Sequence, residues 1–167
     1  FGKSWFVLDL CLSAANGCRF LGHETHKCDC LYLALEDSER RLKSRLQKLL
    51  DGRDAPENFY YATSAPDMDN GLLDQLEDFV ERFPQTGLIV IDTLQKVRGQ
   101  NTRNESAYKY DYREMGLLKA FADRHGILVL LVHHLRKMKD DGDPHARISG
   151  TNGIMGAADT SLVLTKD

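Results

Sequence analysis

The chain has 167 residues, of which 42% are hydrophobic and 28% are charged. This apolar content supports one packed core and excludes a disordered chain. With 22 basic and 25 acidic residues, the formal net charge is −3, which excludes a broad basic surface for nucleic acid. No apolar run reaches the roughly 18 residues that a membrane helix needs, and no signal peptide is visible. We therefore expect a cytoplasmic protein without membrane contact, whose four cysteines stay reduced.

The first half of the chain alternates helix and strand patterns. An apolar segment at 4–16 with a thin polar stripe predicts a largely buried helix. The run LYLAL at 31–35 predicts a buried strand. Asp37 and Ser38 are candidate caps for the next helix, which ends near 51–52.

The second half continues this alternation. In chain order, the patterns predict a strand at 59–62, a helix at 71–83, a strand at 88–91, a helix at 105–125, a strand at 127–132, a loop at 136–147, a short helix within 148–158 and a strand at 161–164. In the helix at 105–125, the spacing of Tyr108 and Tyr112 favours core packing over base stacking. Apolar strands separated by helices predict an α/β fold, a mostly parallel sheet with helices on both faces.

Polar residues follow the predicted strands, at the sheet edge where such folds bind ligands. Glu36 follows LYLAL, Asp92 ends LIVID (88–92), and His133 and His134 follow the most apolar run. An aspartate after a buried strand is typical of the second nucleotide-triphosphatase motif, in which it organises Mg²⁺. The alternatives are a helix-capping aspartate, a solvated glutamate and structural histidines.

The tripeptide Gly2-Lys3-Ser4 matches the second half of the phosphate-binding loop G-x-x-x-x-G-K-[ST]. The glycine lets backbone N–H groups approach phosphate, the lysine reaches the β- and γ-phosphates, and the serine hydroxyl binds Mg²⁺. A chance tripeptide is the alternative. The first glycine of the loop would precede residue 1, so we expect an N-terminally truncated chain.

The segments GKSWFVLDLCL, LYLALEDSERRL, LIVIDTLQKVRG and ILVLLVHHLRKM, in this order, resemble the RepA-like branch of the RecA-type ATPases. These are AAA-family plasmid replicative helicases and their relatives on mobile elements. The resemblance implies one RecA-like P-loop NTPase domain over residues 1–167, without its first strand and the start of its phosphate loop. It also implies ATP and Mg²⁺ as ligands, a ring-shaped homo-hexamer and movement on single-stranded DNA.

The same resemblance implies roles for individual residues. Glu36 matches the general base that activates water, and Asp92 and Ser4 match the Mg²⁺-binding pair. His134, with His133 beside it, matches the sensor of the γ-phosphate. The expected nucleotide-binding residues are Gly2, Lys3, Ser4 and Trp5.

Two loops are candidate DNA contacts, because each follows a strand at the catalytic edge and carries basic residues. The first carries Arg98 and Arg103, and the second carries Arg136, Lys137 and Arg147. Solvated loops are the alternative reading of both. Arg147 is also the one internal candidate for an arginine finger.

Two further hypotheses remain at this stage. The domain could be a nucleotide- or DNA-binding replication regulator, or a RecA- or KaiC-like ATPase, without helicase activity. The cysteines and histidines between residues 18 and 30 could bind zinc, although their spacing favours ordinary packing with surface histidines.

Overall fold

A computed structural model of the chain describes residues 2–101, 105–134 and 152–165. Its centre is a four-stranded parallel sheet with the strand order β2-β1-β3-β4. The strands are β1 (Asp29–Ala34), β2 (Phe59–Ala62), β3 (Thr86–Asp92) and β4 (Leu128–Val132). The predicted α/β class with a parallel sheet is confirmed.

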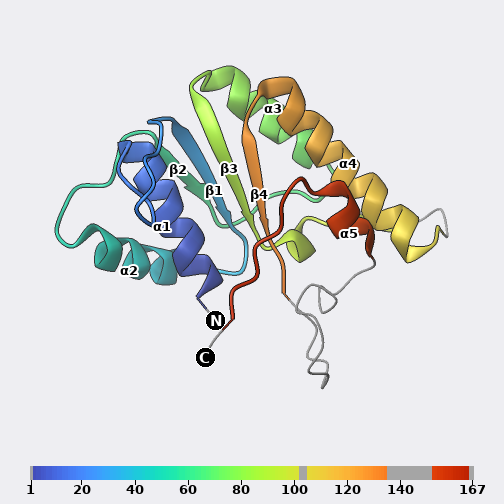
Figure 1. The fold of residues 1–167 in the computed structure, drawn as a ribbon, viewed down its shortest axis with the longest axis horizontal. Helices are drawn as coiled ribbons and strands as arrows, with labels where there is room; N and C mark the ends of the chain where they lie inside the picture. The colour runs from blue at the N-terminus through green and yellow to red at the C-terminus, as the bar shows by residue number, and fades with distance from the viewer. Residues whose placement is uncertain (1, 102–104, 135–151, 166–167) are drawn as a thin grey trace.

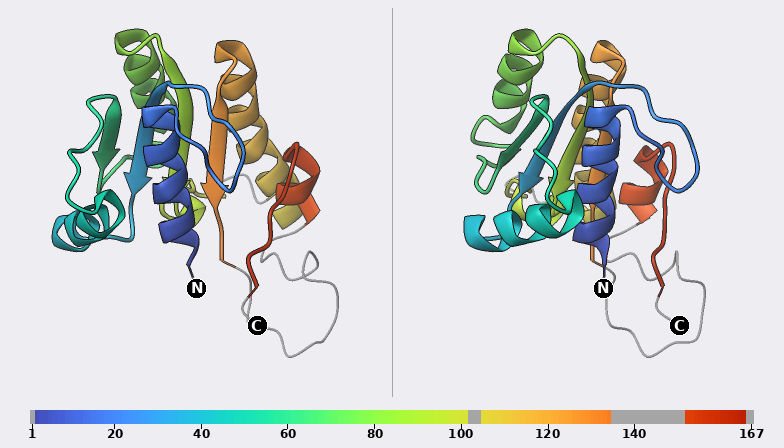
Figure 2. Two further views of the ribbon diagram at one scale, coloured as in Figure 1. Left: turned by 60° about the vertical axis from the view of Figure 1, so that its left-hand side comes forward. Right: turned by 90° about the vertical axis from the view of Figure 1, so that its left-hand side faces the viewer.

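Helices cover both faces of this sheet (Figures 1 and 2). They are α1 (Lys3–Asn16), α2 (Glu39–Leu50), α3 (Leu72–Arg82), the 3₁₀ helix η1 (Leu94–Lys96), α4 (Ala107–His125) and α5 (Asn152–Ala157). The apolar residues of α1 and α2 pack on one face of the sheet, and those of α3, α4 and α5 pack on the other.

The strands divide their side chains between two hydrophobic cores. On β1, Tyr32 joins the core with α1 and α2, while Leu31 and Leu33 join the core with α3 and α4. On β3, Val90 and Ile89 divide in the same way. Successive strand residues point to opposite faces, so a strand covered on both sides must be apolar throughout. This explains why the strands read as continuous apolar runs.

Local signals set the helix ends as predicted. Ser38, not Asp37, caps α2, and its hydroxyl accepts a hydrogen bond from the backbone N–H of Arg41 at 3.4 Å. The C-terminus of α1 is set by Gly17, which has a positive φ of 65°. This backbone conformation costs glycine little.

Two predictions in the last third of the chain are wrong. Tyr108 and Tyr112 are 47% and 50% exposed and stack on each other, with ring centroids 6.1 Å apart. The buried face of α4 instead carries Tyr110, Met115 and Leu118. Residues 161–164 are not in a strand.

Among the described helices, none combines the length and apolarity needed to cross a bilayer.

Candidate nucleotide-binding site

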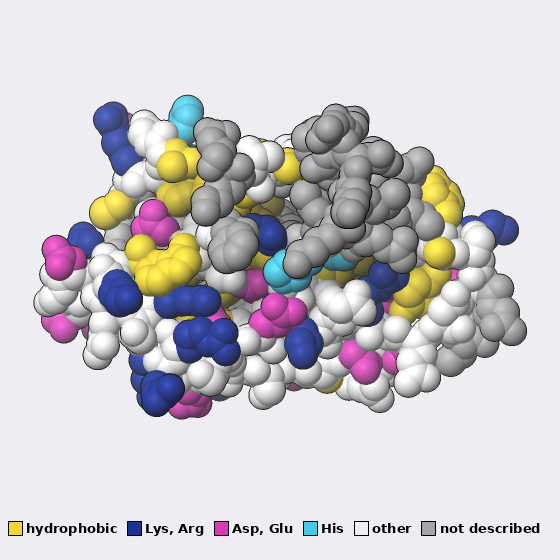
Figure 3. All heavy atoms as spheres, turned by 90° about the horizontal axis from the view of Figure 1, so that it is seen from below, with side chains coloured by type: hydrophobic (Ala, Val, Ile, Leu, Met, Phe, Trp, Pro, Cys, Tyr) yellow, Lys and Arg dark blue, Asp and Glu magenta, His cyan; other side chains and the backbone are white. Residues whose placement is uncertain are grey.

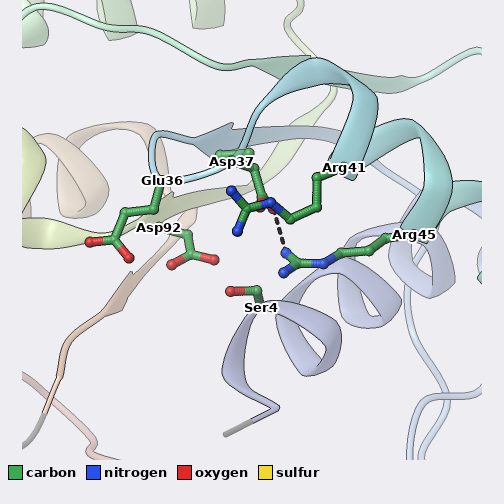
Figure 4. Close-up of a pocket in the computed structure, with 7 residues that line it drawn as sticks. Ser4, Glu36, Asp37, Arg41, Arg45 and Asp92 are labelled. Atoms are coloured by element: carbon green, nitrogen blue, oxygen red, sulfur yellow. Dashed lines mark hydrogen bonds and ion pairs between the residues drawn. The ribbon is translucent and has the colours of Figure 1, made fainter.

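The sheet has a topological switch point between β1 and β3. From β1 the chain continues outward to β2 on one side, and from β3 it continues to β4 on the other. In open α/β sheets the crevice beyond the carboxyl ends of two such strands is where ligands bind. Glu36 follows β1 at this crevice, Asp92 ends β3, and α1 begins beside them with Ser4 in its first turn (Figure 4).

Asp92 is almost fully buried, with 4% of its surface exposed. Its Oδ2 accepts a hydrogen bond of 2.9 Å from the phenol of Tyr32, a fully buried residue of β1. Burial, followed by the nearby charge of Asp92, raises the pKa of Tyr32. The phenol therefore stays protonated and donates, which orients the Asp92 carboxylate at the end of the strand.

The Glu36 side chain contacts one residue that follows β3 and one residue that follows β4. The hydroxyl of Thr93 donates to Glu36 Oε1 at 3.2 Å, and Nε2 of His134 lies 3.4 Å from Oε2. The Glu36 side chain is 45% exposed, so water reaches the carboxylate that these contacts hold. His133 is half-buried, and the ring placed against Glu36 is that of His134.

Two arginines of α2 form the opposite wall of the site. Arg41 Nε lies 3.2 Å from Asp37 Oδ1, and Arg45 pairs with Asp37 Oδ2. The Arg45 guanidinium also lies over the ring of Trp5, 5.7 Å from its centroid. Figure 4 shows both guanidinium groups on one side of a small cavity, with the Glu36 and Asp92 carboxylates across from them. The cavity has a volume of about 80 Å³.

The first turn of α1 borders this cavity. Gly2 has a φ of 90°, and α1 begins there without a side-chain cap or an acidic residue in its first turn. The backbone N–H groups of such a turn, with the partial positive charge of the helix end, suit a phosphate group. Lys3 and Ser4 lie half-buried in this turn, and Ser4 lines the cavity.

The donor set at this edge fits Mg²⁺ bound together with a phosphate ligand. Mg²⁺ prefers oxygen donors and takes one or two carboxylates, with phosphates and water completing its shell. The Ser4 hydroxyl and the Asp92 carboxylate both line the cavity and supply such donors. Viewed from this edge, acidic side chains and histidine lie near the middle and basic side chains gather toward α2 (Figure 3).

A parallel sheet with a helix N-terminus, a buried strand-end aspartate and a glutamate at its switch point is consistent with a RecA-like P-loop core. The family model described as an AAA domain matches residues 1–140 of this chain. The chain therefore belongs to the AAA domain family, which makes it an ATPase-type domain. No curated protein matches the sequence.

The structure gives Arg98 a different role from the DNA contact predicted for it. Its side chain is 16% exposed and pairs with Asp111 and with Glu114, at 2.9 Å for the latter. The guanidinium of Arg98 is bound by two side chains of α4, so it does not project from a loop toward a ligand. The other candidate DNA contacts, Arg103, Arg136, Lys137 and Arg147, lie outside the described residues.

Sequence reasoning missed Tyr32, Thr93 and the two arginines of α2. A tyrosine inside an otherwise apolar strand was the available signal for Tyr32, because a buried phenol requires a hydrogen-bond partner. The spacing of Asp37 and Arg41, four residues apart, indicated one of the arginine contacts. Nothing in the sequence marked the approach of Thr93 to Glu36, which are 57 residues apart.

The alternative zinc site concerned the cysteines and histidines between residues 18 and 30. Within the described part of the chain, no group of three or more His, Cys, Asp or Glu side chains is placed to hold a metal ion. Cys28 and Cys30 instead contact each other, as described below.

Replacing Tyr32 with Phe removes the donor to Asp92 and leaves a buried carboxylate oxygen without it. We expect the free energy of unfolding to fall by about 1.5–3 kcal/mol, the usual range for a hydrogen bond to a charged group. Urea denaturation of the two proteins measures this difference. Tyr61→Phe on β2 is the matched control, because Tyr61 is 37% exposed. Equal losses in the two variants would contradict a specific role of the Tyr32 hydroxyl.

Proposed function

We propose that the chain is the ATP-binding and ATP-hydrolysing part of a RepA-like motor that acts on DNA in plasmid or mobile-element replication. The observation that carries the hydrolytic part is the position of Glu36. Its carboxylate lies in a water-accessible crevice, against His134 and Thr93, at the same strand ends as Asp92 and Ser4. A domain that only held a nucleotide would not need a carboxylate oriented in this way.

Glu36 acts in this proposal as a general base. An ionised carboxylate within hydrogen-bond reach of a water can take its proton as the water attacks the γ-phosphate. Thr93 and His134 restrain the two carboxylate oxygens, so the base stays oriented. Ser4 and Asp92 would hold Mg²⁺, which when bound would supply charge that neutralises the phosphate oxygens.

His134 connects the base to the segment that follows β4. Its ring lies beside Glu36 and is 60% exposed, so it is accessible to a group bound in the crevice. A hydrogen bond from this ring to a terminal phosphate would compete with its contact to Glu36. The presence or loss of that phosphate would then be transmitted to the residues after 134, where the resemblance to RepA-like proteins predicts contact with single-stranded DNA.

The DNA-related part rests on the sequence resemblance, as does assembly into a ring-shaped hexamer. With a net charge of −3, binding to DNA depends on local basic residues and on assembly. The second candidate function is a nucleotide- or DNA-binding regulator, or a RecA- or KaiC-like ATPase, without strand separation. The glutamate at the crevice favours an ATPase over a regulator without turnover.

Two assays on the intact protein separate these functions. We expect Mg²⁺-dependent release of inorganic phosphate from ATP that single-stranded DNA stimulates, together with displacement of a labelled strand from a forked duplex. Hydrolysis without strand displacement would support the KaiC-like ATPase. Nucleotide binding without hydrolysis would support the regulator and contradict the proposed motor.

A further inference from the structure

Two cysteines lie side by side at the start of β1, at the sheet edge opposite the nucleotide site. The Sγ atoms of Cys28 and Cys30 are 3.8 Å apart, and Cys30 Sγ also lies 3.7 Å from the backbone oxygen of Cys28. Neither residue belongs to the crevice formed by Glu36 and Asp92. The pair is therefore independent of the proposed function.

An irregularity in the sheet makes room for this pair. Asp29 pairs with Thr86 and Cys30 pairs with Leu88, so Gly87 is an additional residue on β3. A Cβ atom at position 87 would lie 2.8 Å from both Cβ and Sγ of Cys28. Since glycine has no side chain, the Cys28 thiol occupies this space beside Cys30.

The two thiols differ sharply in their access to solvent. Cys28 is half-buried and lines an open hollow of about 470 Å³ between the ends of α1, β2 and β3. Cys30 has no exposed surface. Burial, followed by the proximity of Cys28, raises the pKa of the Cys30 thiol. A small reagent in the hollow therefore contacts Cys28 first. Cys30 lies beneath it as a protonated thiol.

The backbone around Cys28 is held in place on both sides. Its backbone N–H donates to the backbone oxygen of Ala14 at 3.3 Å, and its carbonyl oxygen accepts from the side-chain amide of Asn58 at 2.5 Å. The N–H of Cys30 donates to the backbone oxygen of Asn58 at 2.9 Å. Cys28 immediately precedes β1. Two residues of extended chain span about 6.6 Å between Cα atoms, within the range that a disulfide bridges. Rotation of the side chains can then bring the sulfurs to bonding distance.

We propose that Cys28 and Cys30 form a reversible thiol-oxidation site for small peroxides. The Cys28 thiolate attacks one oxygen of hydrogen peroxide, the O–O bond breaks, and the departing hydroxide takes up the proton released by Cys28 to form water. Cys28 is then a sulfenic acid. The sulfur of Cys30 attacks the Cys28 sulfur, the S–O bond breaks, and the Cys30 proton leaves with the oxygen as a second water. Two thiols are oxidised to one disulfide, and one peroxide is reduced to two waters.

Peptide mapping tests this pairing directly. Trypsin cleavage after Lys27 and Arg40 yields the peptide 28–40, which contains both cysteines, whereas Cys11 and Cys18 fall together in the peptide 4–19. After treatment of the folded protein with hydrogen peroxide and alkylation, we expect the peptide 28–40 to lose two hydrogen atoms in mass and to resist alkylation. Dithiothreitol should restore both alkylation sites.

Several outcomes of this map would overturn the proposal. These are full alkylation of both cysteines after peroxide treatment, a cross-link from the peptide 28–40 to the peptide 4–19, or oxidation confined to Cys18. A Cys18→Ser background removes the exposed thiol that could join two chains. The map of the chain with its four cysteines intact already decides the pairing, so the test does not depend on a variant that folds poorly.

Two single variants test the order of the steps. In Cys30→Ser, peroxide should leave a sulfenic acid at Cys28 that dimedone labels, because the resolving thiol is gone. In Cys28→Ser, we expect Cys30 to remain unlabelled, because it is fully buried. Preferential labelling of Cys30 would contradict the assignment of Cys28 as the residue that reacts first.

Discussion

Replacing Glu36 with Gln is expected to lower the rate of ATP hydrolysis by about 10²–10⁴-fold, the usual contribution of a general base. The amide has nearly the shape of the carboxylate, so it can still contact Thr93 and His134, but it cannot accept the proton of the attacking water. Binding of ATP should be retained, because Glu36 is not expected to hold the phosphates. Single-turnover phosphate release and fluorescence titration with a nucleotide analogue measure the two effects separately.

Glu39→Gln is the matched control for this substitution. Glu39 lies in the first turn of α2, its side chain is 67% exposed, and it pairs with Lys43 at 3.6 Å on the helix surface. The same chemical change at that position should leave hydrolysis within about twofold, because an exposed ion pair contributes little. Unchanged hydrolysis in Glu36→Gln would contradict the role of Glu36 as the base. Loss of nucleotide binding in that variant would show that its effect is structural.

Replacing Arg98 with Ala is expected to lower the free energy of unfolding by about 3–5 kcal/mol, the usual cost of removing one partner from a buried ion pair. Arg98 is the cation between Asp111 and Glu114, whose side chains are 3% and 2% exposed. It also lies over the ring of Tyr110, 4.9 Å from the centroid.

The same network joins α4 to the residues that follow η1. Glu114 Oε1 accepts a hydrogen bond of 2.7 Å from the N–H of Gly99 and one of 2.8 Å from the phenol of Tyr110. Burial, followed by Glu114, raises the pKa of Tyr110 to about 12, so this phenol remains a donor at neutral pH. Removing Arg98 therefore loosens the connection between β3 and α4 as well as removing one ion pair.

Urea denaturation of Arg98→Ala beside Arg124→Ala tests this expectation. Arg124 pairs with Glu77 at 2.7 Å but its side chain is 64% exposed, so its loss should cost less than about 1 kcal/mol. Arg98→Lys should recover part of the stability, because it keeps the charge but loses the planar fork that contacts two carboxylates. Equal stabilities for Arg98→Ala and Arg124→Ala would contradict the structural role assigned to Arg98.

The sequence by itself predicted β1 to β4 and most of the helices, together with a strand at 161–164 that the structure does not have. Strands covered on both faces must be apolar throughout, and this pattern is visible without a structure at 31–35 and 88–91. Helix ends were predictable for a similar local reason, since Ser38 acts on N–H groups only a few residues away. The positions of Glu36 and Asp92 at the same edge of the sheet followed from the rule that the carboxyl ends of parallel strands meet at one edge.

The tertiary structure decided which side chains meet at that edge and which face of α4 is buried. The helical spacing of Tyr108 and Tyr112 favoured their burial. The structure instead buries Asp111 and Glu114, although acidic residues are normally exposed. The two buried carboxylates pair with Arg98, which lies 13 and 16 residues before them, in the segment that follows η1. Two other contacts likewise join segments about 60 residues apart. Tyr32 donates to Asp92, and the Cys28 side chain lies where a side chain at position 87 would be. Sequence patterns report local geometry and average burial, whereas a partner across the sheet exists only once the strands are in register.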